Sequence, residues 1–186
     1  MKRETLLAQA GSRWDARTGA VSMPIYQVAT FRHPALGEST GFDYSRSGNP
    51  TRQALEETVA ALDGGARGLA FASGMAAVDC LLRLFSPGDR VIVTEDLYGG
   101  TYRLLEKVYR PLGIETIYVD TSSVAAVERA WTDRVRAVFV ETPTNPLLKT
   151  ADLPALCALA RARGALSFID NTFFTPVLQR PLEAGA

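Results

Sequence analysis

The chain has 186 residues, of which 47% are hydrophobic and 22% are charged, a balance typical of one globular domain with a sizeable core. Its 20 Lys and Arg residues equal its 20 Asp and Glu residues, so no net field favours binding to nucleic acid or to a membrane. No apolar run approaches the roughly 18 residues of a membrane-spanning helix, and the start has no signal-peptide core, so we expect a cytoplasmic protein.

The first 48 residues are patterned differently from the rest of the chain. Residues 1–12 read as a short helix. Residues 13–48 lack a clean period and carry several proline and glycine turn formers. A structureless stretch of this length is unusual inside a compact domain. We therefore expect it either to be disordered or to pack against something outside its own domain.

A regular alternation of helices and strands begins at Asn49, the N-cap of a helix that has Pro50 at its first position. The next patterns predict strands over 68–72, 90–95, 114–120, 136–141 and 166–170, with helices over 74–85, 101–109, 124–131 and 153–163 between them. This order indicates an α/β fold with at least five mainly parallel strands and flanking helices. Ligands of such sheets bind beyond the carboxyl ends of the strands.

Small residues, Ser73-Gly74-Met75, follow the first predicted strand. Free backbone N–H groups at the start of the next helix, together with the helix dipole, suit a phosphate, and Gly74 lets the backbone approach closely. An ordinary tight turn explains the same residues, because neither a dinucleotide-binding glycine motif nor a P-loop is present.

The loops after two later strands each allow two interpretations, a functional one and a structural one. Tyr98 lies beside two glycines, so its ring can cover a flat ligand, or it can be an exposed tyrosine next to a helix cap. The loop after Glu141 contains two prolines, which aim Asn145 in one direction or simply make a rigid connector.

The last predicted strand ends at Asp170, directly after apolar residues. A semi-buried carboxylate there needs a cationic or hydrogen-bonded partner. A protonated pyridine nitrogen is one such partner, and a capping role at the next segment is the alternative. Cys80 and Cys157 lie inside apolar helical patterns, so we interpret them as small core residues and assign no metal site.

In combination these motifs resemble the transsulfuration family of pyridoxal-phosphate enzymes, the group of cystathionine γ-synthase, cystathionine β-lyase and γ-lyase. The matching stretches are residues 24–27, 44–51, 72–77, 96–103, 141–146 and 170–176, and they extend over essentially the whole chain. The resemblance implies pyridoxal 5′-phosphate as cofactor and a fold like the large domain of fold-type I (aspartate aminotransferase-like) enzymes, incomplete at the C-terminus. It also implies an arm over residues 1–48 that contacts a neighbouring subunit, and a partial cofactor-binding domain over 49–186.

The resemblance further implies roles for single residues. The Gly74 and Met75 amides, with Ser73, would hold the cofactor phosphate. Tyr98 would stack on the ring and take part in proton transfer. Asp170 would pair with the pyridine nitrogen. In a complete dimer or tetramer, the arm reaches the phosphate of a neighbouring subunit's cofactor. The other implied site residues are Tyr44 and Arg46 on that arm, Thr172 on the cofactor side, and Arg103, Asn145 and Glu141 on the side of a small amino-acid substrate.

In this family a lysine in a Ser-x-x-Lys motif forms the Schiff base, and it should follow shortly after a segment like 181–186. The lysines present, Lys2, Lys107 and Lys149, have no matching context. We therefore expect a fragment that is inactive alone, from an enzyme acting on cystathionine or on an O-acylhomoserine plus cysteine.

The sequence leaves β-lyase, γ-lyase and γ-synthase open. A non-catalytic subunit or pseudoenzyme that keeps the cofactor cradle is the alternative. The missing glycine fingerprint argues against a Rossmann-like dehydrogenase, and the combination of Tyr44, Arg46 and residues 73–75 argues against an aminotransferase.

Overall fold

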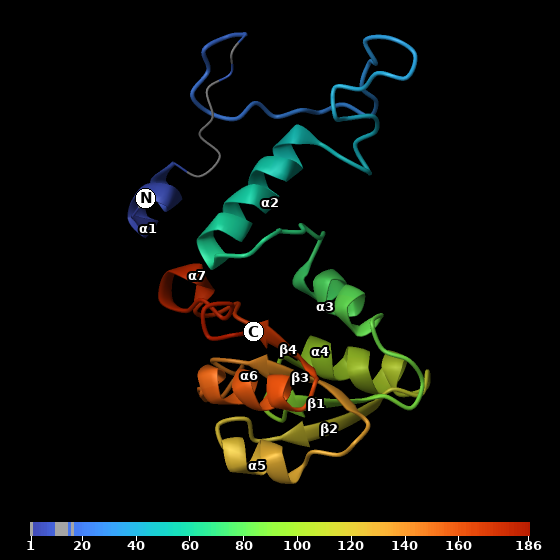
Figure 1. Ribbon diagram of the computed structural model, residues 1–186, viewed down its shortest axis with the longest axis vertical. Helices are drawn as coiled ribbons and strands as arrows, with labels where there is room; N and C mark the ends of the chain where they lie inside the picture. Colours follow the sequence, from blue (N-terminus) through green and yellow to red (C-terminus); the bar gives the residue numbers. More distant parts are fainter. Residues whose placement is uncertain (1, 10–14, 16) are drawn as a thin grey trace. The chain divides into compact units, whose positions relative to one another are not determined.

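The computed structural model describes residues 2–9, 15 and 17–186 (Figure 1). Contacts between Cα atoms divide the chain into two compact units, Met1–Ala70 and Phe71–Ala186. The helix expected over residues 1–12 is α1, Arg3–Ala8, and residues 10–12 lie outside the described part. Because the units divide after Ala70, the helix that starts at Pro50 belongs with the first unit.

That helix, α2 (Pro50–Asp63), begins as the sequence predicts: Asn49 Oδ1 accepts a hydrogen bond from the Thr51 amide at 2.9 Å. It ends at Gly64, whose φ of 73° suits a residue without a side chain. The chain before α2 is irregular in its described part, with short-range pairing between two of its stretches. Thr30 and Tyr44 form an antiparallel bridge, and the Phe31 amide donates to the Asp43 carbonyl at 3.0 Å.

The second unit is a four-stranded parallel sheet in the order β2-β1-β3-β4, with helices between successive strands. This confirms the predicted α/β class with a parallel sheet and flanking helices. The elements are α3 (Gly74–Leu82), β1 (Arg90–Thr94), α4 (Gly99–Leu104), the π-helix η1 (Leu105–Tyr109), β2 (Glu115–Val119), α5 (Val124–Arg129), β3 (Val135–Glu141), α6 (Leu153–Ala162), β4 (Leu166–Asp170) and α7 (Thr175–Leu178).

The prediction of at least five strands is wrong for the described residues, because 68–72 is not a strand. A strand needs a neighbour for its backbone hydrogen bonds, and no described strand pairs with this segment. The Ala70 amide donates to Glu56 Oε1 at 3.0 Å instead. Leu69 and Phe71 are 65% and 43% exposed, so the apolar side chains of this segment do not join the core.

The core fills both faces of the sheet because neighbouring strand residues point in opposite directions. On one face Val91 and Val93 pack with residues of α3, α4 and η1, and on the other Ile92 packs with residues of α5 and α6. Cys157 is buried in α6, as expected, whereas Cys80 is exposed on α3, which corrects its assignment to the core. No helix among the described residues is long and apolar enough to cross a bilayer.

Candidate functional site

A pocket of about 340 Å³ in the second unit gathers residues that follow β1, β3 and β4 with the start of α3. The structure thus brings together the strand-end residues that the sequence singled out. Its lining consists of Ser73, Gly74, Met75, Val78, Tyr98, Thr101, Glu141, Pro143, Asn145, Asp170, Thr172 and Phe173.

The start of α3 presents backbone donors to this pocket. Ser73 caps the helix, since its Oγ accepts from the Ala76 amide at 3.1 Å and its carbonyl accepts from the Ala77 amide at 3.2 Å. Among the described residues, the Gly74 and Met75 amides of this first turn have no acceptor. A Cβ built on Gly74 would meet no atom within 4 Å, so open space lies beside its backbone. These features form a donor set that suits an anionic group.

The ring of Tyr98 lies against the first turn of α4. A Cβ built on Gly100 would lie 2.3 Å from Tyr98 Cε1 and 3.0 Å from Met75 Sδ, so only glycine leaves room for the ring as placed. The side chain lines the pocket and is 47% exposed. Of the two glycines, Gly100 makes room for the ring, whereas a Cβ on Gly99 would meet Arg103 Nη1 instead.

Asp170 at the end of β4 has one occupied and one open carboxylate oxygen. Oδ1 accepts from the Thr172 amide at 3.1 Å and from the Thr172 hydroxyl. Oδ2 has no partner among the described residues. The half-buried group therefore keeps one open acceptor oxygen on the pocket side, and Thr172 orients the carboxylate.

Glu141 at the end of β3 is only 5% exposed. Its Oε2 accepts from the Tyr98 amide at 2.8 Å, and its Oε1 accepts from the Asn145 amide at 2.9 Å. Burial raises the pKa of Glu141, and the nearby charges of Asp170 and Asp96 add to the increase, while the two amide bonds oppose it.

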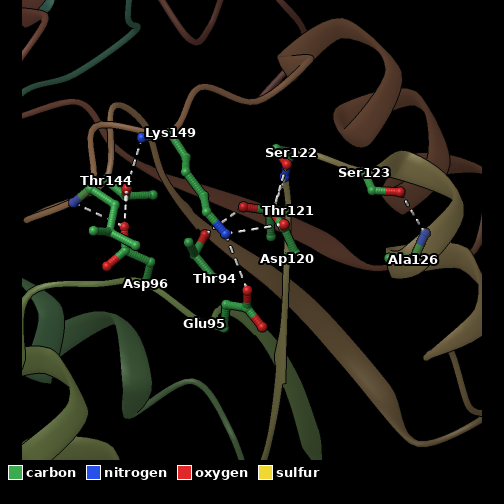
Figure 2. Close-up of polar contacts among 11 residues, drawn as sticks. Thr94, Glu95, Asp96, Asp120, Thr121, Ser122, Ser123, Ala126, Thr144 and Lys149 are labelled. Carbon is green, nitrogen blue, oxygen red and sulfur yellow. Dashed lines mark hydrogen bonds and ion pairs between the residues drawn. The ribbon is translucent and has the colours of Figure 1, made fainter.

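A second polar cluster lies outside the pocket lining (Figure 2). Lys149 Nζ is 3.1 Å from Asp120 Oδ2 and 3.3 Å from Glu95 Oε1, after strands β2 and β1. The hydrogen bonds to Asp120 and Glu95 raise the pKa of Lys149. Figure 2 shows its chain reaching between the two carboxylates. Among the described residues, no lysine lines the pocket.

Three predicted site residues are not in the pocket lining. Arg103 is exposed on α4, with Nη1 close to Gly99. Tyr44 and Arg46 belong to the first unit, where the Arg46 guanidinium lies 5.0 Å from the centroid of the Tyr44 ring. Both side chains are exposed.

The sequence reasoning missed other lining residues, of which Thr101 is the most informative. Its side chain is 1% exposed, and its Oγ1 lies 3.8 Å from Met75 Sδ. Its place three residues after Tyr98 at a helix start is a usable signal, because residues three apart share a helical face. Phe173, Pro143 and Val78 are apolar and carried no such signal.

Comparison with known proteins gives one consistent result. The profile of the Cys/Met metabolism PLP-dependent enzymes matches residues 4–186. A cystathionine gamma-lyase of Bacillus subtilis is 51% identical over 186 residues, covering 100% of this chain and 49% of that protein. A cystathionine gamma-synthase of Haemophilus influenzae is 51% identical over 184 residues, covering 98% of this chain and 50% of that protein.

The solved structures agree. The cystathionine gamma-lyase from Lactobacillus plantarum complexed with L-serine superimposes with a TM-score of 0.95 at 49% identity, covering 100% of this chain and 49% of that one. The chain thus spans about half the length of the curated relatives it matches. Lyase and synthase relatives are equally identical to it, so identity does not select a reaction.

Proposed function

The chain belongs to the Cys/Met metabolism PLP-dependent enzymes, and from this membership we propose that the whole protein is a transsulfuration enzyme. Its cofactor is the one that defines the family, pyridoxal 5′-phosphate. The proposed substrates are cystathionine, or an O-acylhomoserine together with cysteine, in a β- or γ-elimination or a γ-replacement. One observation carries this proposal: amide donors, an aromatic wall and a carboxylate with an open oxygen meet in one pocket.

The pocket residues fit the cofactor's two charged ends. The Gly74 and Met75 amides, assisted by the Ser73 hydroxyl, would bind its phosphate. Asp170 Oδ2 would accept a hydrogen bond from its pyridine nitrogen, with Thr172 holding the carboxylate in place. When bound, the cofactor supplies an electron-withdrawing ring that acidifies the substrate α-carbon.

Proton transfer and contact with the substrate would be carried out by other side chains. Tyr98 would stack on the ring, and its phenol would hold or transfer a proton near the reacting carbon. Asn145 lines the same pocket and would contact the substrate. Arg103 lies outside the lining, so a contact with substrate would require its long side chain to reorient.

We propose that the first unit completes the site of a neighbouring copy in a homodimer or homotetramer. Tyr44 and Arg46 are exposed and already packed on each other, which presents a cation and a phenol as one group. If so, mixed oligomers of whole-protein Arg46→Ala and Asp170→Ala subunits should recover part of the activity. No recovery in verified mixed oligomers would place the site within one chain.

A non-catalytic subunit that keeps the cofactor cradle is the second candidate, because the amide donors, Tyr98 and Asp170 of this pocket would hold the cofactor without contributing an amine. The two candidates differ in one observation. A reading frame that continues past Ala186 into a Ser-x-x-Lys motif supports the enzyme, and cystathionine turnover by that longer protein decides the matter. A protein that binds cofactor but neither attaches it to lysine nor turns over cystathionine is the non-catalytic subunit.

The cofactor assignment is tested with pyridoxine 5′-phosphate, which lacks the aldehyde and so binds without reacting with any amine. Its fluorescence on titration with the chain gives the dissociation constant. Asp170→Asn should weaken binding about tenfold, because the ring nitrogen loses a charged acceptor. Asp133→Asn is the matched control: Asp133 is exposed before β3, at the opposite end of that strand, and binding should be unchanged. Equal affinity of both variants would refute the assigned role of Asp170.

A further inference from the structure

The two loops that carry Tyr98 and Asn145 are joined by a pair of carboxyl groups. Glu141, at the start of the loop after β3, accepts from the Tyr98 amide in the loop after β1. Asp96, in the loop after β1, accepts from the Leu147 amide at 3.1 Å and from the Thr144 hydroxyl in the loop after β3. Each loop therefore supplies an acceptor to the other, and Figure 2 shows the Thr144–Asp96 contact.

Glu141 is the inner member of this pair and the more constrained one. Its two oxygens accept from two different backbone amides, Tyr98 at 2.8 Å and Asn145 at 2.9 Å. The Glu141 amide donates to Thr94 Oγ1 at 3.1 Å, which fixes its backbone to the end of β1. The side chain is buried at 5% exposure, so water cannot readily replace a lost bond.

These contacts give Glu141 a structural role that does not require contact with the substrate. Backbone amides are fixed donors, and a buried group that accepts from two of them holds both segments at one separation. Tyr98 and Asn145 are 47 positions apart in the sequence yet line the same pocket. Glu141 is an acceptor that both walls share.

We propose that Glu141 is a positioning residue, which sets the spacing of the Tyr98 and Asn145 walls of the pocket through their backbone amides. The spacing itself is a property of the chain. Its consequence for holding the cofactor rests on the proposed function.

The test is amide hydrogen exchange in the ¹⁵N-labelled chain with Glu141→Gln. The glutamine keeps one acceptor oxygen and turns an NH₂ group toward the second amide, so one bond is lost and the other strained. We expect the Tyr98 and Asn145 amides to exchange about tenfold faster or more, and both amide protons to shift upfield. Protection of β1 and β3 should be unchanged, which separates a local effect from unfolding.

Glu106→Gln is the matched control. Glu106 is also a largely buried glutamate with two partners, the Tyr118 hydroxyl at 2.9 Å and Arg110 Nη1 at 2.6 Å, and it bonds to neither loop. Its replacement should leave the Tyr98 and Asn145 amides at wild-type exchange rates. If Glu141→Gln leaves either of these two amides unchanged in rate and shift, the proposal is wrong.

A second measurement connects the spacing to the ligand. Pyridoxine 5′-phosphate should bind several-fold more weakly to Glu141→Gln than to the wild type, and equally to Glu106→Gln. Faster exchange with unchanged affinity would overturn the part that concerns the ligand. Absence of any binding to the wild-type chain would contradict the proposed function instead, and the exchange experiment would still decide the role of Glu141.

Discussion

Glu141 and Asp170 are register partners at the carboxyl ends of the adjacent parallel strands β3 and β4, and both line the pocket. The two carboxyl groups differ in burial and in their hydrogen bonds. Glu141 is buried and accepts from two backbone amides, whereas Asp170 is half-buried and has an open oxygen. Burial, and then the charge of Asp170, raise the pKa of Glu141. Two acids on one sheet edge thus differ: Glu141 has both oxygens bonded inside the protein, and Asp170 keeps one oxygen open to the pocket.

The raised pKa of Glu141 predicts the sign of a pH dependence. Between the ordinary value of 4.5 and the higher folded value, the folded chain binds more protons at this site than the unfolded chain does. The free energy of unfolding therefore contains a term that falls as pH rises through this window and is constant above it. Glu141→Gln lacks the term. Urea titrations at several pH values give the unfolding free energy of the variant and of the wild type. As pH increases from about 4.5, the wild type should lose stability relative to the variant. A shift in the opposite direction would contradict the assigned pKa change.

Gly100→Ala tests the placement of the Tyr98 ring. The new Cβ would lie 2.3 Å from Tyr98 Cε1, so the ring must move, yet side chains alone are displaced. Alanine also favours the helix by up to about 1 kcal/mol, so we expect a stability change within about 1 kcal/mol. Binding of pyridoxine 5′-phosphate should nevertheless weaken several-fold, because the aromatic wall has shifted.

Gly99→Ala is the control for this change. A Cβ there meets only the Arg103 guanidinium, at 3.3 Å, and that side chain is exposed and can move. Its affinity should stay at the wild-type level. Equal affinities of the two variants would show that the ring position does not matter for the ligand.

Tyr109→Phe tests the contact that joins η1 to α3. The single O–H of Tyr109 is shared between Asp79 Oδ1 at 2.8 Å and the Asp79 carbonyl at 2.9 Å, and the side chain is buried. Phenylalanine keeps the packing but loses this shared hydrogen bond, so the unfolding free energy should fall by about 1 kcal/mol at neutral pH. Tyr102→Phe, at an exposed position on α4, should change it by less than about 0.5 kcal/mol.

The same variant has a signature at alkaline pH. Burial, and then the hydrogen bond to Asp79, raise the pKa of Tyr109 from 10.0 to about 12. The folded chain keeps this proton between those values while the unfolded chain releases it, so wild-type stability should decline there with rising pH. Tyr109→Phe should lack this part of the decline. Identical slopes for the two proteins would contradict the raised pKa.

The sequence predicted most of what local patterns determine. Asn49 caps its helix as expected, since capping needs only the next few residues, and the helix predicted from Gly74 begins there, with Ser73 as its cap. Asp170 and Asn145 reach the pocket because residues after parallel strands meet at one sheet edge. The failed strand at 68–72 depended on a pairing partner, which no local pattern supplies.

Other features of the site depend on contacts between distant residues. The bond from the Tyr98 amide to Glu141 spans 43 positions, so no spacing in the sequence indicated that Glu141 is a common acceptor. Arg103 is not in the pocket lining, and helix geometry explains why. Thr101, two positions earlier on α4, lines the pocket, and residues two apart on a helix point to different sides. The motif over residues 96–103 therefore includes pocket-lining residues, but it does not determine which of its side chains line the pocket.

The last prediction concerns the amines of this chain. We expect that the 186-residue chain, mixed with pyridoxal 5′-phosphate and reduced with borohydride, gives no adduct at one specific lysine and no thiol release from cystathionine above free cofactor. Attachment requires an uncharged amine beside the bound ring. Lys149 is held between Asp120 and Glu95, which raise its pKa and keep it charged, and it does not line the pocket. Lys107 is exposed on η1 and also lies outside the lining.

Lys149→Met provides the control for this experiment. The ion pairs of Lys149 are partly exposed, so the variant should lose no more than about 1 kcal/mol of stability. Its affinity for pyridoxine 5′-phosphate should equal that of the wild type, and scattered surface labelling of lysines should be the same in both proteins. A single trapped lysine together with turnover, both lost in Lys149→Met, would place Lys149 in the reaction and overturn the prediction.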